Sequence, residues 1–93
     1  MNNHELLELV ARRAGLDGTD DLLTKCKTTE YVRARAVAVM LLTNRGVGVN
    51  EIGRLLNHYP RTIRHARDTW PHVWAKDATA RWLYEECQAT AEW

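Results

Sequence analysis

The side chains best suited to chemistry lie in one short segment that begins at Pro60. Proline is typical of the first turn of a helix, where its missing N–H costs little. Ile63, Ala66 and Trp70 recur at helical spacing and predict the buried side of that helix. The polar residues between them are therefore expected on the outer side: Arg61, Thr62, Arg64, His65 and Asp68.

Arginine on the first turns of an exposed helix favours nucleic-acid binding. Its guanidinium group can donate two parallel hydrogen bonds to guanine O6 and N7, and a recognition helix brings its N-terminal residues to the base edges of the major groove. The predicted major-groove residues are Arg61, Thr62, Arg64 and His65. The alternative is a solvated, arginine-rich helix face with no partner.

Other kinds of site have little support. The chain has no serine, its two cysteines lack CxxC spacing, and no pair among its four histidines has metal-ligand spacing. The glycines of GVGVNEIG, residues 46–53, follow a predicted helix and lack the GKT ending of a phosphate loop. We therefore expect a protein that is not an enzyme, with no metal, cofactor or nucleotide and with reduced thiols.

The charges are unevenly distributed along the 93 residues, although the formal net charge is only +1. Residues 25–67 carry nine Lys or Arg and two acids, a net charge of +7, whereas residues 1–24 and 68–93 each carry −3. A basic segment of this kind indicates a polyanionic partner such as double-stranded DNA. The acidic ends are expected to face away from DNA and to limit indiscriminate binding.

Helix signals recur along the whole chain, which predicts an all-α protein, a compact bundle of about six helices. Expected helices are 4–14, a short one through Leu22 and Leu23, and then 30–44, 51–57, 60–70 and 71–91. Asn3, Thr28 or Thr29, and Asn50 are the expected N-caps. Two short helices joined by three or four residues, the second opening on proline, match a helix-turn-helix. Gly53 in the first of them suggests that another helix crosses close by.

The last segment is rich in aromatic residues. Its expected helix has two apolar stripes. One stripe can pack on the domain core, so the second stripe suggests a further apolar surface that a partner would cover. Trp70 and Trp74 are expected to seal the core. The predicted partner or dimer surface consists of Trp82, Tyr84 and Trp93. The chain is therefore expected to consist of a helix-turn-helix domain over 1–70 and a C-terminal helix over 71–93. The alternative to DNA binding is a protein-interaction module whose C-terminal helix binds a partner or a second copy.

Three motifs between about Glu5 and Trp70 resemble the C-terminal origin-binding domain of the bacterial replication initiator DnaA. The segment DLLTKCKTTEYVRARAVAVMLL resembles the family's DLLSKRR, basic loop and ARxRQxAMYL helix. VNEIGRLL resembles SLPEIGRAF, and TIRHA resembles TTVLHA. The resemblance covers about two thirds of the chain and implies a helical domain with a helix-turn-helix that binds double-stranded DNA.

The resemblance also implies roles for particular residues. Arginines at the start of the family's long helix enter the minor groove, and the matching residues here are Arg33 and Arg35. The family's basic loop and the start of its first helix-turn-helix helix contact phosphates. With Arg54 added from its place on the fourth helix, the expected phosphate contacts are Lys25, Lys27, Thr28, Asn50 and Arg54.

The resemblance fails where the family reads sequence. Its signature GGRDHTTV is replaced by NHYPRTI, so the Asp-His-Thr trio has no counterpart except Thr62. We expect no recognition of the standard DnaA box, and a different site defined by Arg61, Arg64 and Tyr59. The family's ATPase has no counterpart in these residues, which suggests a stand-alone regulator of transcription, an accessory replication factor or a product of a phage or mobile element.

No apolar run approaches the roughly 18 residues that span a bilayer, and the first residues lack the basic and apolar regions of a signal peptide. A cytoplasmic protein without a membrane partner is expected.

Overall fold

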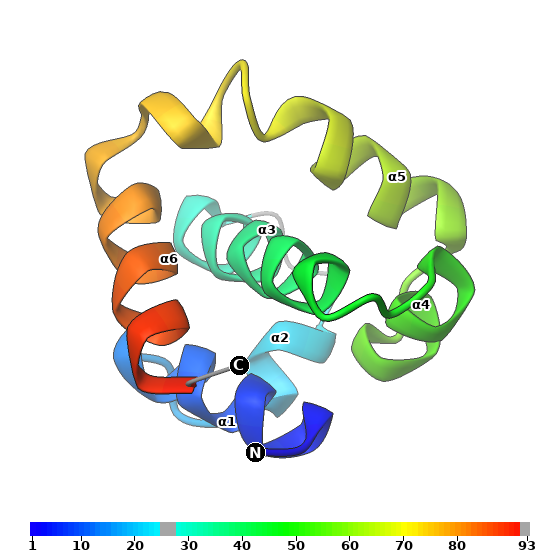
Figure 1. The fold of residues 1–93 in the computed structure, drawn as a ribbon, viewed down its shortest axis with the longest axis horizontal. Coiled ribbons are helices and arrows are strands. Elements are labelled where there is room, and N and C mark those ends of the chain that lie inside the picture. Colours follow the sequence, from blue (N-terminus) through cyan, green and yellow to red (C-terminus); the bar gives the residue numbers. More distant parts are fainter. Residues whose placement is uncertain (25–27, 92–93) are drawn as a thin grey trace.

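The third helix, α3 (Thr29–Asn44), is the centre of the structure, a computed structural model that describes residues 1–24 and 28–91. It packs against all five other α-helices, and Figure 1 shows them arranged around it. Small side chains let neighbouring helices approach it closely. Its buried residues are Ala34, Ala36, Val37, Ala38, Val39, Leu41 and Leu42. This confirms the helix that the sequence predicts over residues 30–44.

The remaining elements follow the predicted order closely. They are α1 (Asn3–Arg13), α2 (Asp20–Leu23), α4 (Val49–Leu56), α5 (Pro60–Thr69), a one-turn 3-10 helix η1 (Trp74–Lys76) and α6 (Ala78–Ala91). The described residues thus form six α-helices and no strand, so the all-α fold class is correct. No helix within 1–24 and 28–91 combines the length and apolarity needed to cross a membrane.

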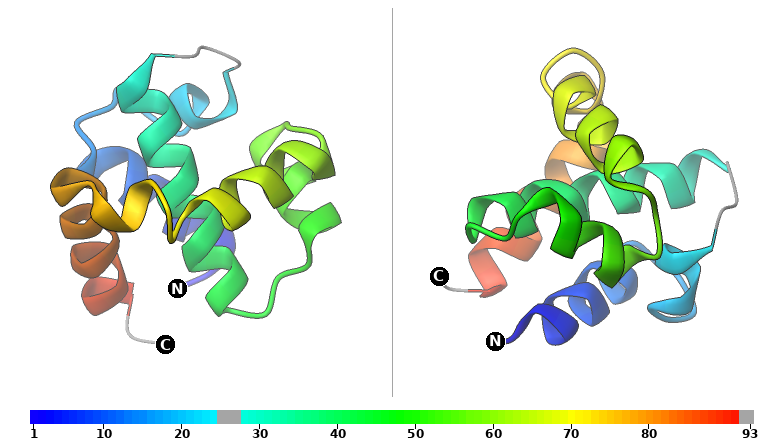
Figure 2. Two further views of the ribbon diagram at one scale, coloured as in Figure 1. Left: turned by 90° about the horizontal axis from the view of Figure 1, so that it is seen from above. Right: turned by 90° about the vertical axis from the view of Figure 1, so that its right-hand side faces the viewer.

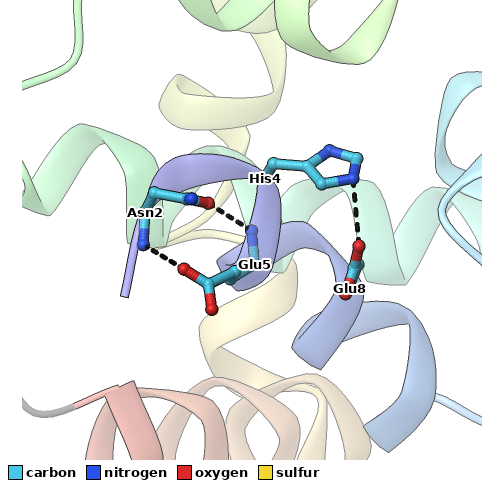
Figure 3. Close-up of polar contacts among 4 residues, drawn as sticks. All are labelled: Asn2, His4, Glu5 and Glu8. Atoms are coloured by element: carbon cyan, nitrogen blue, oxygen red, sulfur yellow. Dashed lines mark hydrogen bonds and ion pairs between the residues drawn. The ribbon is translucent and has the colours of Figure 1, made fainter.

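Local capping explains how α1 begins. The side chain of Asn2 accepts from the backbone N–H of Glu5 at 2.8 Å, and the Glu5 carboxylate accepts from the backbone N–H of Asn2 at 3.0 Å (Figure 3). This reciprocal pair satisfies two N–H groups at the helix start. One turn further on, His4 Nε2 lies 3.0 Å from a carboxylate oxygen of Glu8 (Figure 3). Asn2 is therefore the N-cap, and the prediction of Asn3 was wrong by one residue.

The start of α4 also differs from prediction. Gly48 has the extended backbone of an N-cap, and Asn50 is an exposed residue in the first turn of the helix, two positions after the cap. The predicted cap at Asn50 is therefore wrong, because Val49 already has helical geometry. The helix is held to the core by Ile52 and Leu56, both fully buried.

The predicted helix from Pro71 to Ala91 is broken. The chain turns after α5, passes through η1, and begins α6 only at Ala78. Asp77 explains the new start, since its side chain accepts from the backbone N–H of Ala80 at 2.9 Å and its carbonyl from that of Arg81 at 3.0 Å. A carboxylate that accepts from a first-turn N–H is a strong N-cap. The helix therefore begins after Asp77 and not at Pro71.

One apolar core joins α6 to the rest of the protein. Leu83 and Cys87 are buried together with Leu6 and Val10 of α1 and with Leu41 of α3. Only one of the two predicted α6 stripes is covered in this way. Residues 71–91 are therefore part of the same core as residues 1–70, and their removal would expose that core.

Candidate nucleic-acid interface

The connection between α4 and α5 is built from three residues, Asn57, His58 and Tyr59. Asn57 closes α4 in the left-handed conformation, with φ of 56°. His58 N–H donates to the carbonyl of Gly53 at 2.9 Å, and a Cβ added to Gly53 would meet the carbonyl oxygen of His58 at 2.7 Å. The nearest neighbour of Gly53 is thus the turn that leads into α5, and the backbone nitrogen of Pro60, the first residue of α5, lies 3.7 Å from the added Cβ.

The inner side of α5 is fixed to the core, as the spacing predicts. Ile63 is 2% exposed, and Ala66 and Trp70 pack against the core as partly buried residues. The opposite side of the helix carries polar side chains. All four predicted major-groove residues are exposed: Arg61, Thr62, Arg64 and His65. Three of them, without Arg64, also line a shallow open hollow.

The outer side of α4 adds a further exposed cation, Arg54, beside this helix. Asn50 and Arg54 are exposed one turn apart, and an open hollow extends from them to Tyr59 and Pro60. Tyr59 is 72% exposed, which places an aromatic ring at the surface between the two helices. Figures 1 and 2 show α4 and the start of α5 on the side of the molecule away from α6.

An acid already pairs with the arginine of α4. Glu51 Oε1 accepts from Arg54 Nη2 at 2.9 Å. This hydrogen bond and the charge of Arg54 lower the pKa of Glu51, and the same contact raises the pKa of Arg54. Both groups stay charged at neutral pH, so Glu51 competes with any anion that approaches Arg54.

Other arginines of the basic segment contact neighbouring parts of the protein. Arg33 faces α6, where its Nε lies 3.4 Å from Oδ1 of Asp77. Arg45 binds the start of the chain, donating to Oδ1 of Asn3 at 3.0 Å and to the carbonyl of Met1. The +7 segment of the sequence is therefore not one surface stripe, because two of its arginines bind neighbouring elements instead.

Arg35 is the second predicted minor-groove residue, and it is partly buried. Its Nη1 donates to the backbone carbonyl of Thr24, at the end of α2, and lies 3.5 Å from Nε2 of His58. Arg33 and Arg35 thus make contacts in different parts of the molecule. Thr28 is exposed at the N-cap of α3, and Lys25 and Lys27 lie outside the described residues.

The residues of the predicted partner surface differ in how far they are exposed. Tyr84 is half-buried, its ring centroid is 5.3 Å from that of Trp70, and its hydroxyl accepts from Asn44. Tyr84 is therefore a packing residue. Trp82 is 49% exposed and remains available at the surface, whereas Trp93 lies outside the described residues. Trp70 and Trp74 pack against the core as expected.

Within residues 1–24 and 28–91, no group of three or more His, Cys, Asp or Glu side chains could hold a metal ion. Cys87 is fully buried, and this burial raises the pKa of its thiol to about 11. A thiol protonated at neutral pH is a poor nucleophile.

The fold and the surface together define a small all-α protein that exposes arginines on two consecutive helices. No family model, no curated protein and no solved structure matches the chain.

Proposed function

We propose that α4, the three-residue turn and α5 act as a helix-turn-helix that binds double-stranded DNA in a sequence-dependent way. The carrying observation is that Arg61 and Arg64 are exposed on a helix whose opposite side is anchored by Ile63. A rigid helix that presents two bidentate donors near its N-terminus is the geometry needed to read guanine in the major groove.

In this proposal the contacts divide by chemistry. Arg61 and Arg64 read base edges, and Thr62 and His65 contact bases or the sugar-phosphate backbone beside them. Asn50 and Arg54 contact phosphates on the outer side of α4, as does Thr28 with Lys25 and Lys27. Phosphate contacts fix the register of the protein on the duplex, while base contacts specify the sequence.

The proposal gives different roles to the two arginines expected in the minor groove. Arg33 is assigned to the contact with Asp77, and Arg35 to the contact with the end of α2. The motif resemblance to the DnaA origin-binding domain supports the choice of partner. The absence of the Asp-His-Thr trio supports a target other than the DnaA box.

Selection of bound sequences from a random duplex pool tests both DNA binding and specificity. The selected site is then titrated by fluorescence anisotropy with the double variant R61A/R64A and with R12A/R81A. The control removes the same charge from exposed arginines of α1 and α6. Loss of one bidentate contact costs about 1–3 kcal/mol of discrimination.

We expect R61A/R64A to lose the preference for the selected site over random duplex, and the control to keep it. Equal loss of this preference in both variants would show that the effect comes from net charge alone. A pool that shows no enrichment at moderate salt would overturn the proposal.

A second function is favoured by one observation, the exposure of the large apolar side chain of Trp82, which is 49% exposed. Tryptophan is enriched at binding hot spots, so α6 could bind a partner protein or a second copy. Light scattering of the wild type and of W82A tests self-association. A wild-type monomer at high micromolar concentration removes the second-copy form of this function.

A further inference from the structure

A cavity of about 180 Å³ lies between α3 and α5, and of its lining residues only Thr62 and His65, on α5, also belong to the DNA contacts proposed above. Its walls are mainly apolar. They consist of Val32, Ala36, Val39, Leu56, Ile63, Ala66 and Trp74. The cavity is partly open to solvent, so a small molecule can enter without unfolding the core.

One end of the cavity is polar and carries positive charge. Arg35 and His58 both line it, and Nη1 of Arg35 lies 3.5 Å from Nε2 of His58. Arginine stays protonated at all physiological pH values and donates from five N–H groups. Thr62, His65 and Thr69 line the edge along α5, with the Thr69 hydroxyl 3.5 Å from Nε2 of His65.

The size of the cavity limits the ligand to a single ring or a branched chain. A dry protein cavity of about 150 Å³ binds benzene, so about 180 Å³ accommodates a body of that size with one polar group. Nucleotides and fatty acids are larger than this space. The apolar walls favour a hydrocarbon body, and the arginine favours an anionic group at the polar end.

We propose that this cavity is a binding site for a small apolar carboxylic acid, with the hydrocarbon body between α3 and α5 and the carboxylate at Arg35 and His58. Binding of such an acid does not rest on the proposed DNA function. The ligand would nevertheless contact the inner side of α5, on which Ala66 lies opposite the exposed arginines. A ligand in this cavity would therefore change the packing of α5 against α3.

Titration of the full chain by ¹⁵N–¹H correlation NMR tests the site, with benzoate, benzyl alcohol and benzylamine as probes of similar size and different charge. We expect saturable shifts from benzoate at amides of cavity residues such as Ala36 and Ala66. Benzyl alcohol should bind at least about tenfold more weakly, because it lacks the charge-assisted hydrogen bonds. Benzylamine should bind least.

Two outcomes of these titrations would overturn the proposal. The first is the lack of saturable shifts with benzoate up to about 10 mM, a concentration at which even a weak fragment-sized ligand binds detectably. The second is equal binding of the acid and the amine, which would remove the role of the positive end.

A cavity-filling variant localises the binding. A66L places three further carbon atoms at the wall of the cavity, and A89L makes the same change at an exposed position of α6. We expect A66L to lose benzoate binding at least tenfold and A89L to bind as the wild type does. T69L fills the same space from the next turn of α5 and replaces A66L if that variant does not fold. Unchanged binding in the folded filling variant would overturn the assignment.

Discussion

Nε of Arg33 lies 3.4 Å from Oδ1 of Asp77, and this ion pair joins the basic middle of the chain to its acidic C-terminal segment. Both side chains are less than one third exposed. Because Asp77 also caps α6, the same carboxylate fixes the start of that helix and its position against α3. Part of the charge asymmetry seen along the sequence is thus neutralised inside the fold.

Replacement of Asp77 should separate its capping role from its ionic role. D77A should lower the free energy of unfolding by about 1 kcal/mol through loss of the cap, and D77N should lose less, since asparagine also caps helices. Urea denaturation at pH 7 measures both values. A D77A variant as stable as the wild type would contradict the capping role of the side chain.

The stability contribution of Asp77 should also depend on pH. The hydrogen bond from the Ala80 N–H, and then the charge of Arg33, lower the pKa of Asp77 in the folded protein. Its contribution is therefore fully present above the unfolded-state pKa and is lost as pH falls through the folded one, below about pH 4. The difference in urea midpoint between wild type and D77N should be smaller near pH 2.5 than at pH 7. A constant difference would contradict this.

Gly53 should tolerate no side chain. An alanine Cβ would lie 2.7 Å from the carbonyl oxygen of His58, a backbone atom, so the turn between α4 and α5 would have to shift. We expect G53A to lose about 1–3 kcal/mol of stability, the range for overpacking. G18A is the matched control, because a Cβ at Gly18 meets nothing within 4 Å. Thermal unfolding of both variants by circular dichroism provides the comparison, and equal melting temperatures would refute the close approach.

The Cys87 thiol should report on unfolding. It is fully buried, and burial raises its pKa to about 11, so the reactive thiolate is scarce at pH 8. In a C26A background, in which Cys87 is the remaining cysteine, a colorimetric thiol reagent should react at the rate of opening of the core. Adding about 4 M urea should accelerate the reaction strongly. Immediate reaction in buffer would show that α6 opens without global unfolding.

Removal of Glu51 should strengthen DNA binding if Arg54 contacts phosphate. Glu51 binds Arg54 at 2.9 Å, so its negative charge would repel a phosphate that contacts Arg54. E51Q should bind DNA roughly two- to fivefold more tightly at low salt, the effect of one exposed charge pair. Anisotropy titrations over a range of salt should show the gain disappear near about 1 M, where the Debye length is about 3 Å. E85Q on α6 is the control, and an equal gain there would assign the effect to net charge.

Deletion of the acidic C-terminal residues cannot by itself test whether their charge limits nonspecific DNA binding. From the sequence, removal of residues 72–93 is expected to raise nonspecific DNA affinity at low salt, provided that this helix is not needed for folding. Leu83 and Cys87 are buried in the common core, so this deletion would unfold the protein instead. Single charge-neutral substitutions on α6 test the same idea with the fold intact.

Local sequence patterns predict the first five helices and the two sides of α5. Helical periodicity is a local property, so Ile63 inward and Arg61 and Arg64 outward could be predicted from spacing alone. Pro60 likewise marks the start of that helix, where the structure places it. Local signals were ambiguous for α6, because Pro71 and Asp77 are both residues typical of a helix start.

Which charged and aromatic residues share a surface depends on contacts between helices that are far apart in the sequence. Arg45 binds Asn3 across 42 residues, and Tyr84, which the sequence places on the partner surface, packs on Trp70. Long side chains take their partners from helices that are adjacent in space, and nothing in the local pattern states which helices those are. The cavity between α3 and α5 has the same origin, because it exists only where the two helices fail to fill the space between them.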